Sequence, residues 1–329
     1  MEQRRINIDQ KWIYQAGTCG PMAALTGEAQ GREVNLPHDC MLEKDVEPHS
    51  PAGHAMGYYG GIIGCYTKYL EIPKRWSCDK LYLYFDGVMA ETSVEINGSP
   101  AATHCYGYTP FQADITPFVH FGESNRITVT CSVGMEPDSR WYTGAGIYRH
   151  VDLIRTPRLH IKADGIFAHT EYIDYKDGIP ASARLQVEIT VVNDTPDDRI
   201  AAAEASLFPA EPDDPGDTAI LTGSASVLVK AGKAARVRIP MTVKHPRLWD
   251  AEHPFLYRVG ASVKDRGIFR TCLSPSAGQP MEDHCFILFG IRTVTSDSIH
   301  GLRINGKIAQ RERLQCGAPR PQPAVSRAA

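Results

Sequence analysis

The sequence predicts an all-β protein built from two β-sandwiches. Short runs that alternate polar and apolar residues, or are rich in β-branched residues, recur along the chain between Gly, Pro, Asn and Asp. Asn97-Gly98 follows one such run and is the strongest hairpin signal, because a type I′ turn needs positive φ at both central residues. Long helical periodicity is nearly absent. Regular short strands separated by turn signals are typical of β-sandwiches.

The expected strands follow one another through both halves of the sequence. They are Leu81–Phe85, Ser93–Ile96, Arg126–Thr130, Val151–Ile154, Leu185–Val192, Ser226–Val229, Arg236–Ile239 and Tyr257–Val263. The run Ala201–Ser206 is helix-like in composition. Because strand signals flank it and Pro209 follows, we interpret it as a strand or sheet edge.

Breaks in the strand pattern, marked by proline, divide the chain into two predicted domains and a tail. One β-sandwich is expected over 1–157, where the run from Val151 ends at Pro157, and a second over 158–293. Residues 294–329 form the remainder, and the Pro/Arg/Ala/Gln-rich part after Lys307 is expected to be disordered.

Composition and charge exclude several classes of partner. The 329 residues are 43% hydrophobic and 22% charged, as in an ordinary soluble globular protein. A net charge of −3 gives no bias toward nucleic acid or membrane surfaces. No apolar run approaches the ~20 residues of a membrane span, and the polar start lacks a signal core. We therefore expect a cytoplasmic protein with no nucleic-acid or membrane partner.

The nine cysteines form no Cys-x-x-Cys pair. Several lie in strand-like runs, such as Cys65 and Cys131. We interpret them as small buried thiols in a reducing compartment rather than as metal ligands or disulfides.

A set of motifs, in order over about 300 residues, resembles glycoside hydrolase family 2, the β-galactosidase and β-glucuronidase group. Asp138–His150 is similar to the signature that ends the family's first domain, and Val34–Asp39 to its opening motif, with Cys40 where Trp is usual. Further matching segments are Gly60–Pro73, Leu83–Val88, Val94–Gly98, Gly107–Phe111, Asp114–Thr116, Arg247–Tyr257, Phe289–Arg292 and Leu302–Lys307. The resemblance implies a galactose-binding-like jelly roll followed by an immunoglobulin-like domain.

The resemblance also places the family's catalytic carboxylates on a later (β/α)₈ barrel. The family's acid/base lies in an Asn-Glu pair, and this sequence contains no Asn-Glu dipeptide. We therefore expect no catalytic residue, cofactor or metal in this chain. The family pattern stops after Lys307, which a frameshift would explain. The expectation is a truncated β-galactosidase-like hydrolase of O-glycosyl bonds that is inactive alone.

One loop of the first domain is implied to reach the sugar in intact relatives. It precedes Gly146 and supplies Asp138, Arg140, Trp141 and Tyr142 as candidate substrate-binding residues, acting only together with a barrel. Arg140 stands where several relatives carry an Asp; its guanidinium would donate planar hydrogen bonds, and Trp141 or Tyr142 would stack on a sugar face. The alternative is that Arg140 and Trp141 only hold an interdomain seam.

Other aromatic and polar residues have structural interpretations. His38 and Asp39 fix a turn, and Trp249 and Tyr257 anchor the second core. The loop His49–His54, with Tyr58 and Tyr59, is a second, weaker approach to a sugar.

Two function classes remain open. The first is the truncated glycosidase, whose partners would be a carbohydrate, bound weakly, and a separate barrel fragment or a second copy of the chain. The second is a stand-alone carbohydrate-binding or interaction module of two β-sandwiches. The barrel lead-in Leu302–Lys307 favours the first.

Overall fold

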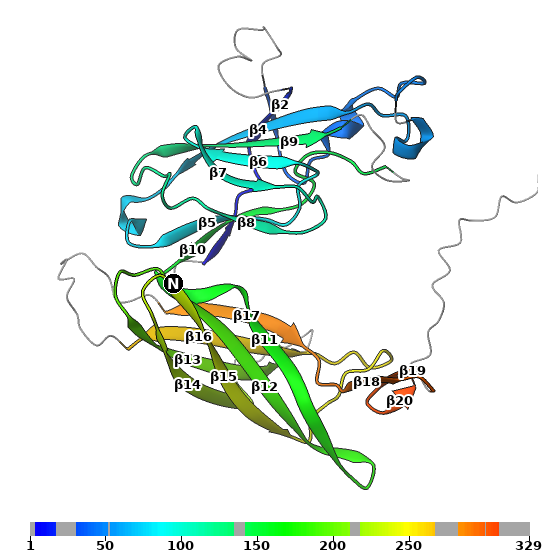
Figure 1. Ribbon diagram of the computed structural model, residues 1–329, viewed down its shortest axis with the longest axis vertical. Helices are drawn as coiled ribbons and strands as arrows, with labels where there is room; N and C mark the ends of the chain where they lie inside the picture. Colours follow the sequence, from blue (N-terminus) through cyan, green and yellow to red (C-terminus); the bar gives the residue numbers. More distant parts are fainter. Residues whose placement is uncertain are drawn as a thin grey trace, which may run out of the picture.

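The computed structural model describes residues 4–17, 31–51, 53–134, 142–210, 218–266, 282–299 and 301–308. Strands dominate it, and Figure 1 shows two stacked sandwiches with a small hairpin beyond the second. The all-β prediction is confirmed. Among the described residues of the first sandwich, the helical elements are three short 3₁₀ turns, η1 (Cys40–Glu43), η2 (Gly53–Met56) and η3 (Lys74–Trp76).

The first sandwich pairs a six-stranded sheet with a four-stranded sheet. The six-stranded sheet has the order β3 (Arg32–Val34), β2 (Trp12–Ala16), β4 (Ile62–Glu71), β9 (Ser124–Val133), β6 (Thr92–Ile96) and β7 (Ser99–His104). The four-stranded sheet has the order β1 (Arg5–Asn7), β10 (Val151–Thr156), β5 (Lys80–Phe85) and β8 (Phe111–Asp114). Alternation in the sequence decides which side chains fill the space between them: Leu81, Leu83 and Phe85 of β5 are all buried.

The hairpin between β6 and β7 turns where the sequence predicts it. Asn97 has φ 53° and Gly98 has φ 84°, as a type I′ turn requires. The Asn97 side chain donates a hydrogen bond to the carbonyl of Phe118 at 2.9 Å, which ties the turn to the rest of the sandwich.

The second sandwich pairs a three-stranded sheet with a four-stranded sheet around its own core. The first has the order β11 (Leu159–Lys176), β12 (Ile179–Asn193) and β15 (Lys233–Lys244); the second has the order β14 (Leu221–Val229), β13 (Arg199–Pro209), β16 (Tyr257–Asp265) and β17 (Asp283–Phe289). The alanine-rich run lies in β13 as predicted, but at the centre of its sheet. Ala203 and Ala205 are buried there because small side chains suit a strand covered by the facing sheet.

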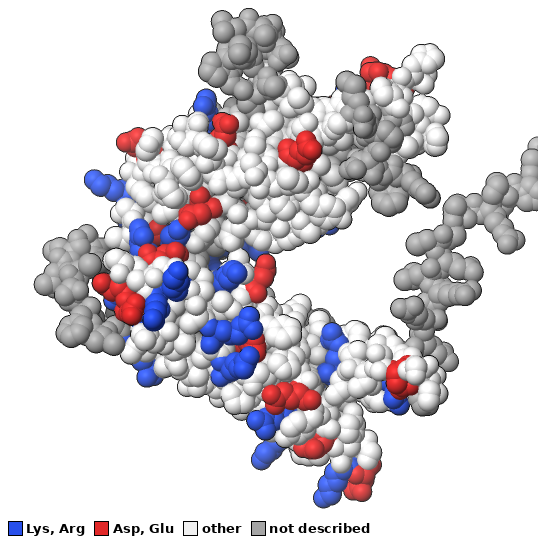
Figure 2. Space-filling view, in the orientation of Figure 1, with Lys and Arg blue, Asp and Glu red and all other residues white. Residues whose placement is uncertain are grey.

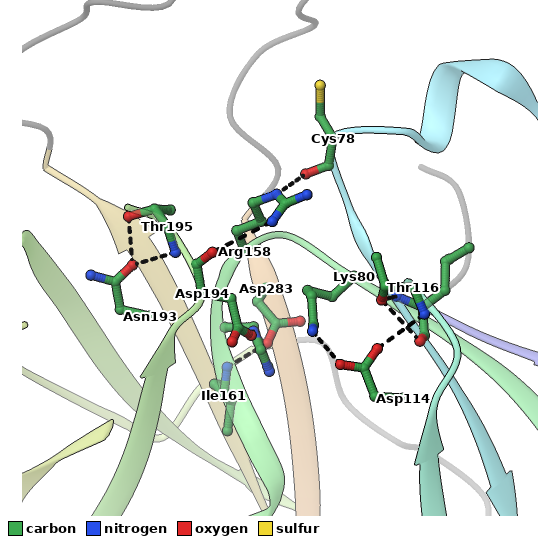
Figure 3. Close-up of polar contacts among 12 residues, drawn as sticks. Cys78, Lys80, Asp114, Thr116, Arg158, Ile161, Asn193, Asp194, Thr195 and Asp283 are labelled. Atoms are coloured by element: carbon green, nitrogen blue, oxygen red, sulfur yellow. Dashed lines mark hydrogen bonds and ion pairs between the residues drawn. The ribbon is translucent and has the colours of Figure 1, made fainter. Parts of the chain in front are cut away.

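A polar junction joins the two sandwiches (Figure 3). Buried Asp283 accepts the backbone N–H of Ile161 at 2.7 Å and the guanidinium of Arg4 at 2.6 Å. Arg158 donates to the carbonyls of Cys78 at 3.1 Å and Asp194 at 3.5 Å. Arg4 and Cys78 belong to the first sandwich, so the Arg4–Asp283 and Arg158–Cys78 bonds cross from one sandwich to the other.

A three-stranded unit follows the second sandwich: β18 (Val294–Asp297), β19 (Gly301–Ile304) and β20 (Lys307–Ile308). Asn305 in its turn donates to the carbonyl of Trp249 at 3.0 Å and accepts from the N–H of Thr293 at 3.0 Å. Tyr257 is a core residue as predicted. Trp249 is not: it is half-buried beneath Arg292, where it holds this unit to the sandwich.

Charge is mixed rather than segregated on the face of the molecule that Figure 2 shows. Figure 2 shows basic and acidic side chains intermingled where the two sandwiches meet. Within the described ranges, no helix is both long enough and apolar enough to cross a membrane.

The cysteines only partly match the expectation of buried thiols. Cys40 and Cys131 are buried free thiols, whereas Cys78 and Cys105 are exposed. Cys65 is disulfide-bonded, so the expectation that the cysteines are all thiols was wrong for this residue.

Candidate functional site

The candidate site is the segment 142–147, which lies against residues 38–40 at one end of the first sandwich. The two stretches run side by side: the N–H of His38 donates to Ile147 at 2.8 Å, and the N–H of Cys40 donates to Ala145 at 3.0 Å. On the other side, Gly146 and Met89 exchange a pair of backbone hydrogen bonds of 2.8 and 2.9 Å. The segment is therefore held from both sides by backbone bonds.

The glycines of the signature are required by the close approach of this backbone. Gly144 and Gly146 have φ of 73° and 102°, in the region that favours glycine. A Cβ on Gly146 would lie 2.8 Å from the carbonyl oxygen of His38, and one on Gly144 would lie 2.7 Å from the carboxylate of Asp39. Both approaches are too short for any residue with a side chain.

Asp39 is the residue that fixes the segment. Its Oδ1 accepts from the N–H of Met41 and from the N–H of Ala145, each at 3.0 Å. Its Oδ2 accepts from the hydroxyl of Tyr142 at 2.6 Å. The local bond to Met41 is the turn predicted from the sequence. The bonds to Ala145 and Tyr142 cross more than a hundred residues, and sequence reasoning missed them.

Tyr142 is the candidate sugar-contact residue that lies within the described ranges. Its hydroxyl is committed to Asp39, and its ring lies 5.4 Å from that of Tyr59 at an interplanar angle of 57°. Burial, and then the hydrogen bond to Asp39, raise the pKa of Tyr142, so the phenol remains a donor. Asp138, Arg140 and Trp141 lie outside the described residues.

The predicted second approach to a sugar lies beside this segment. Tyr59 contacts Tyr142, and its carbonyl accepts from the hydroxyl of buried Ser50 at 2.8 Å, which ties it to the loop at His49–His54. His49, His54 and Tyr58 are exposed. The structure thus brings Tyr59 to Tyr142 and leaves the two histidines in solvent.

A separate polar groove of about 550 Å³ lies on the four-stranded sheet, lined by Arg5, Asn7, Asp9, Tyr84, Asp86, His150 and Asp152. Its two buried carboxylates are partnered, Asp9 by His150 at 2.6 Å and Asp152 by Arg5 at 2.5 Å. These pairs join β1 to β10, so we assign the groove a structural role.

The described part of the candidate segment offers the Thr143 hydroxyl and the Tyr142 ring, groups that suit a sugar hydroxyl and a sugar face. Among the residues that the structure describes, no three His, Cys, Asp or Glu side chains converge as a metal site would require.

Comparison with known proteins identifies the family. Residues 56–157 match the family model described as "Glycosyl hydrolases family 2, sugar binding domain", and residues 160–272 match a second model, "Glycosyl hydrolases family 2". The chain is 30% identical over 307 residues to the β-galactosidase BoGH2A of Bacteroides ovatus and 29% identical over 277 residues to a putative β-glucuronidase of Formosa agariphila. It also superposes on a family 2 glycosyl hydrolase of Bacteroides cellulosilyticus with a TM-score of 0.78 at 26% identity.

These matches cover nearly all of this chain and a minor part of each relative. The alignments span 93% of the chain and 33% of the Bacteroides ovatus enzyme, 83% and 24% for the Formosa agariphila protein, and 93% and 37% for the solved structure. The two family models fall on the two sandwiches in order. The chain belongs to glycoside hydrolase family 2 and holds the family's sugar-binding domain and the immunoglobulin-like domain that follows it.

Proposed function

We propose that this chain is the non-catalytic, substrate-positioning part of a β-galactosidase- or β-glucuronidase-like enzyme. The observation that carries the proposal is that nearly the whole chain aligns with only 33% of a β-galactosidase. Hydrolysis by a retaining glycosidase needs two carboxyl groups about 5–5.5 Å apart. In the proposal that pair belongs to the part of the enzyme that this chain does not match.

The segment 138–142 is proposed to contact the sugar in the complete enzyme. Support comes from the way its C-terminal end is anchored: Asp39 fixes Tyr142 and Ala145, and the glycines place the backbone directly on residues 38–40. A binding loop gains affinity when its ends are fixed before the ligand arrives, because less conformational entropy is lost on binding. The jelly roll over 1–157 is proposed to carry this loop, and 158–293 to join it to the catalytic part.

A chimera tests this proposal. Residues 4–308 would replace the aligned part of the Bacteroides ovatus β-galactosidase, and hydrolysis of aryl β-galactosides and β-glucuronides would be measured. In the active chimera, Arg140→Ala and Trp141→Ala should raise KM about tenfold, since one lost sugar hydrogen bond or stacking contact is worth roughly 1–2 kcal/mol. Exposed Tyr69→Ala is the matched control and should leave KM unchanged. An active chimera with an unchanged KM in both loop variants would contradict the sugar-contact role.

A further inference from the structure

Two exposed tyrosine rings lie on the loop 105–110, between β7 and β8 (Figure 1). Tyr106 is 60% exposed and Tyr108 is 45% exposed. The ring centroids of this tyrosine pair lie 5.6 Å apart at an interplanar angle of 60°, so the rings present two faces inclined to each other. Tyrosine combines an apolar face with a hydrogen-bonding hydroxyl and is enriched at binding surfaces. The pair therefore has the chemistry of a contact surface rather than of a core.

The backbone of this loop is fixed. The hydroxyl of Tyr148 donates to the carbonyl of Gly107 at 2.7 Å. A Cβ on Gly107 would lie 2.8 Å from the methyl carbon of Met89, so the backbone between the two tyrosines packs directly on that side chain. The hydroxyl of Thr109 lies 3.0 Å from Nε2 of His104. Because the loop is held at these points, little conformational entropy of its backbone would be lost when a ligand binds.

Stacked rings tie the start of the loop to the core of the first sandwich. His104, the last residue of β7, stacks on Phe111 with a centroid distance of 4.5 Å and an interplanar angle of 17°. Phe111 stacks in turn on buried Phe85 at 4.7 Å and 10°. The tyrosine pair is therefore presented to solvent by a loop that is built on the core.

Two charged side chains lie beside this loop. The guanidinium of Arg149 lies over the ring of Tyr148, 5.4 Å from its centroid, and Tyr148 is the residue that holds Gly107. Nη1 of Arg149 is 3.9 Å from the carboxylate of Asp86, and the two side chains are 47% and 38% exposed. At that distance the contact is an ion pair without a hydrogen bond, so donors and acceptors remain for a ligand.

The loop adjoins the candidate segment. Gly107 contacts Met89, and Met89 exchanges two backbone hydrogen bonds with Gly146. Residues 38–40 hold the segment on its other side. Loop and segment both fall within residues 56–157, which match the model of a sugar binding domain. A ligand on the tyrosine pair would therefore lie on the Met89 side of the candidate segment.

We propose that the tyrosine pair, flanked by Asp86 and Arg149, is a further saccharide-binding surface of this chain, distinct from the candidate segment. The two rings stack on the apolar faces of sugar units. The carboxylate accepts from sugar hydroxyls, and the planar guanidinium donates to hydroxyls or to the carboxylate of a uronic acid. The choice of β-linked galactose or glucuronate units rests on the proposed function, whereas the surface itself is complete in this chain.

The test is an NMR titration of the full chain with two probes: β-1,4-galactotetraose, and a hyaluronan tetrasaccharide, which carries β-linked glucuronate. At least one probe should give saturable shifts of the Gly107 and Thr109 amides, with a Kd on the order of 1 mM or below. The chimera assay uses aryl monosaccharides and reports on the segment 138–142. The two tests therefore fail independently of each other.

Tyr106→Ala and Tyr108→Ala should each weaken binding about tenfold, the loss expected for one ring contact. Tyr69→Ala is the matched control, because Tyr69 is also 60% exposed, and it should bind as wild type does. Since these rings are exposed, Tm should be unchanged in all three variants, which separates lost binding from lost folding.

Three results would overturn the proposal. The first is that neither tetrasaccharide shifts the loop amides at millimolar concentration. The second is that both tyrosine variants bind as tightly as wild type. The third is that the loop amides respond only to the segment of the Bacteroides ovatus β-galactosidase that this chain does not match, which would make the tyrosine pair a protein interface.

Discussion

At the scale of single residues, Asp39 has the largest expected effect on the candidate site. It accepts hydrogen bonds from Met41, Ala145 and Tyr142, and a hydrogen bond to a charged group contributes roughly 1.5–3 kcal/mol. We expect Asp39→Ala to lower the free energy of unfolding by about 3 kcal/mol in urea denaturation. Tyr142→Phe loses one of these bonds and should cost about a third to a half as much. Equal losses in the two variants would contradict this assignment.

The contact between His150 and Asp9 should make the stability of the folded protein depend on pH. The hydrogen bond to Asp9, and then the negative charge of Asp9, raise the pKa of His150 above its ordinary value. A raised pKa in the folded state means that the stabilisation is complete below the unfolded pKa and is lost as pH rises through the folded pKa. We expect wild type to exceed His150→Gln in Tm at about pH 5.5, with the difference shrinking by about pH 8.5. A difference that grows with pH would contradict this prediction.

The Asp39 and His150 contacts also show what the sequence leaves out at this scale. The motif Val34–Asp39 marks Asp39 as part of a turn, because its bond to Met41 is local. Its partners Ala145 and Tyr142 lie about a hundred residues away, and no periodicity or spacing announces a contact of that kind.

At the scale of elements, two glycines allow the cost of backbone strain to be measured separately from the cost of a steric clash. Gly146 has φ 102° and its Cβ would meet the His38 carbonyl, whereas Gly178 has φ 78° in the β11–β12 turn and its Cβ would meet nothing within 4 Å. Gly178→Ala should cost about 1 kcal/mol from backbone strain alone. Gly146→Ala should cost at least about 3 kcal/mol, since backbone must also move. Chemical denaturation of both variants measures this, and similar losses would show that the close approach is relieved cheaply.

Strands were more predictable than their places in the sheets. Alternation located β5, β6 and β12, and the Asn97-Gly98 turn fixed the β6–β7 hairpin, because these signals are local. The central position of β13 was missed, since alanine is a weak strand former and only the facing sheet makes small side chains favourable there. Trp249 was misplaced in the core because its partners, Arg292 and Asn305, follow the second sandwich's strands in sequence.

At the scale of the whole molecule, Asp283 joins the two sandwiches. It is buried and accepts from Arg4 and from the N–H of Ile161. Asp283→Ala leaves the N–H of Ile161 without its partner and removes the ion pair with Arg4, and we expect it to destabilise the protein by about 3 kcal/mol. The lost stability should mainly weaken the coupling between the two sandwiches. A single thermal unfolding transition should therefore broaden or split in calorimetry. Exposed Glu252→Ala is the control; an unchanged transition in Asp283→Ala would show that the sandwiches are coupled elsewhere.

Under the proposed function, this chain positions substrate for catalytic groups located on another part of the enzyme. The direct measurement is complementation: the chain is mixed with a separately produced segment of the Bacteroides ovatus β-galactosidase that it does not match, and hydrolysis of an aryl β-galactoside is followed. We expect no turnover from the chain alone and turnover from the mixture that saturates with chain concentration. Turnover by the purified chain alone, or a stable monomer that neither binds nor activates the other segment, would contradict the claim and favour an independent binding module.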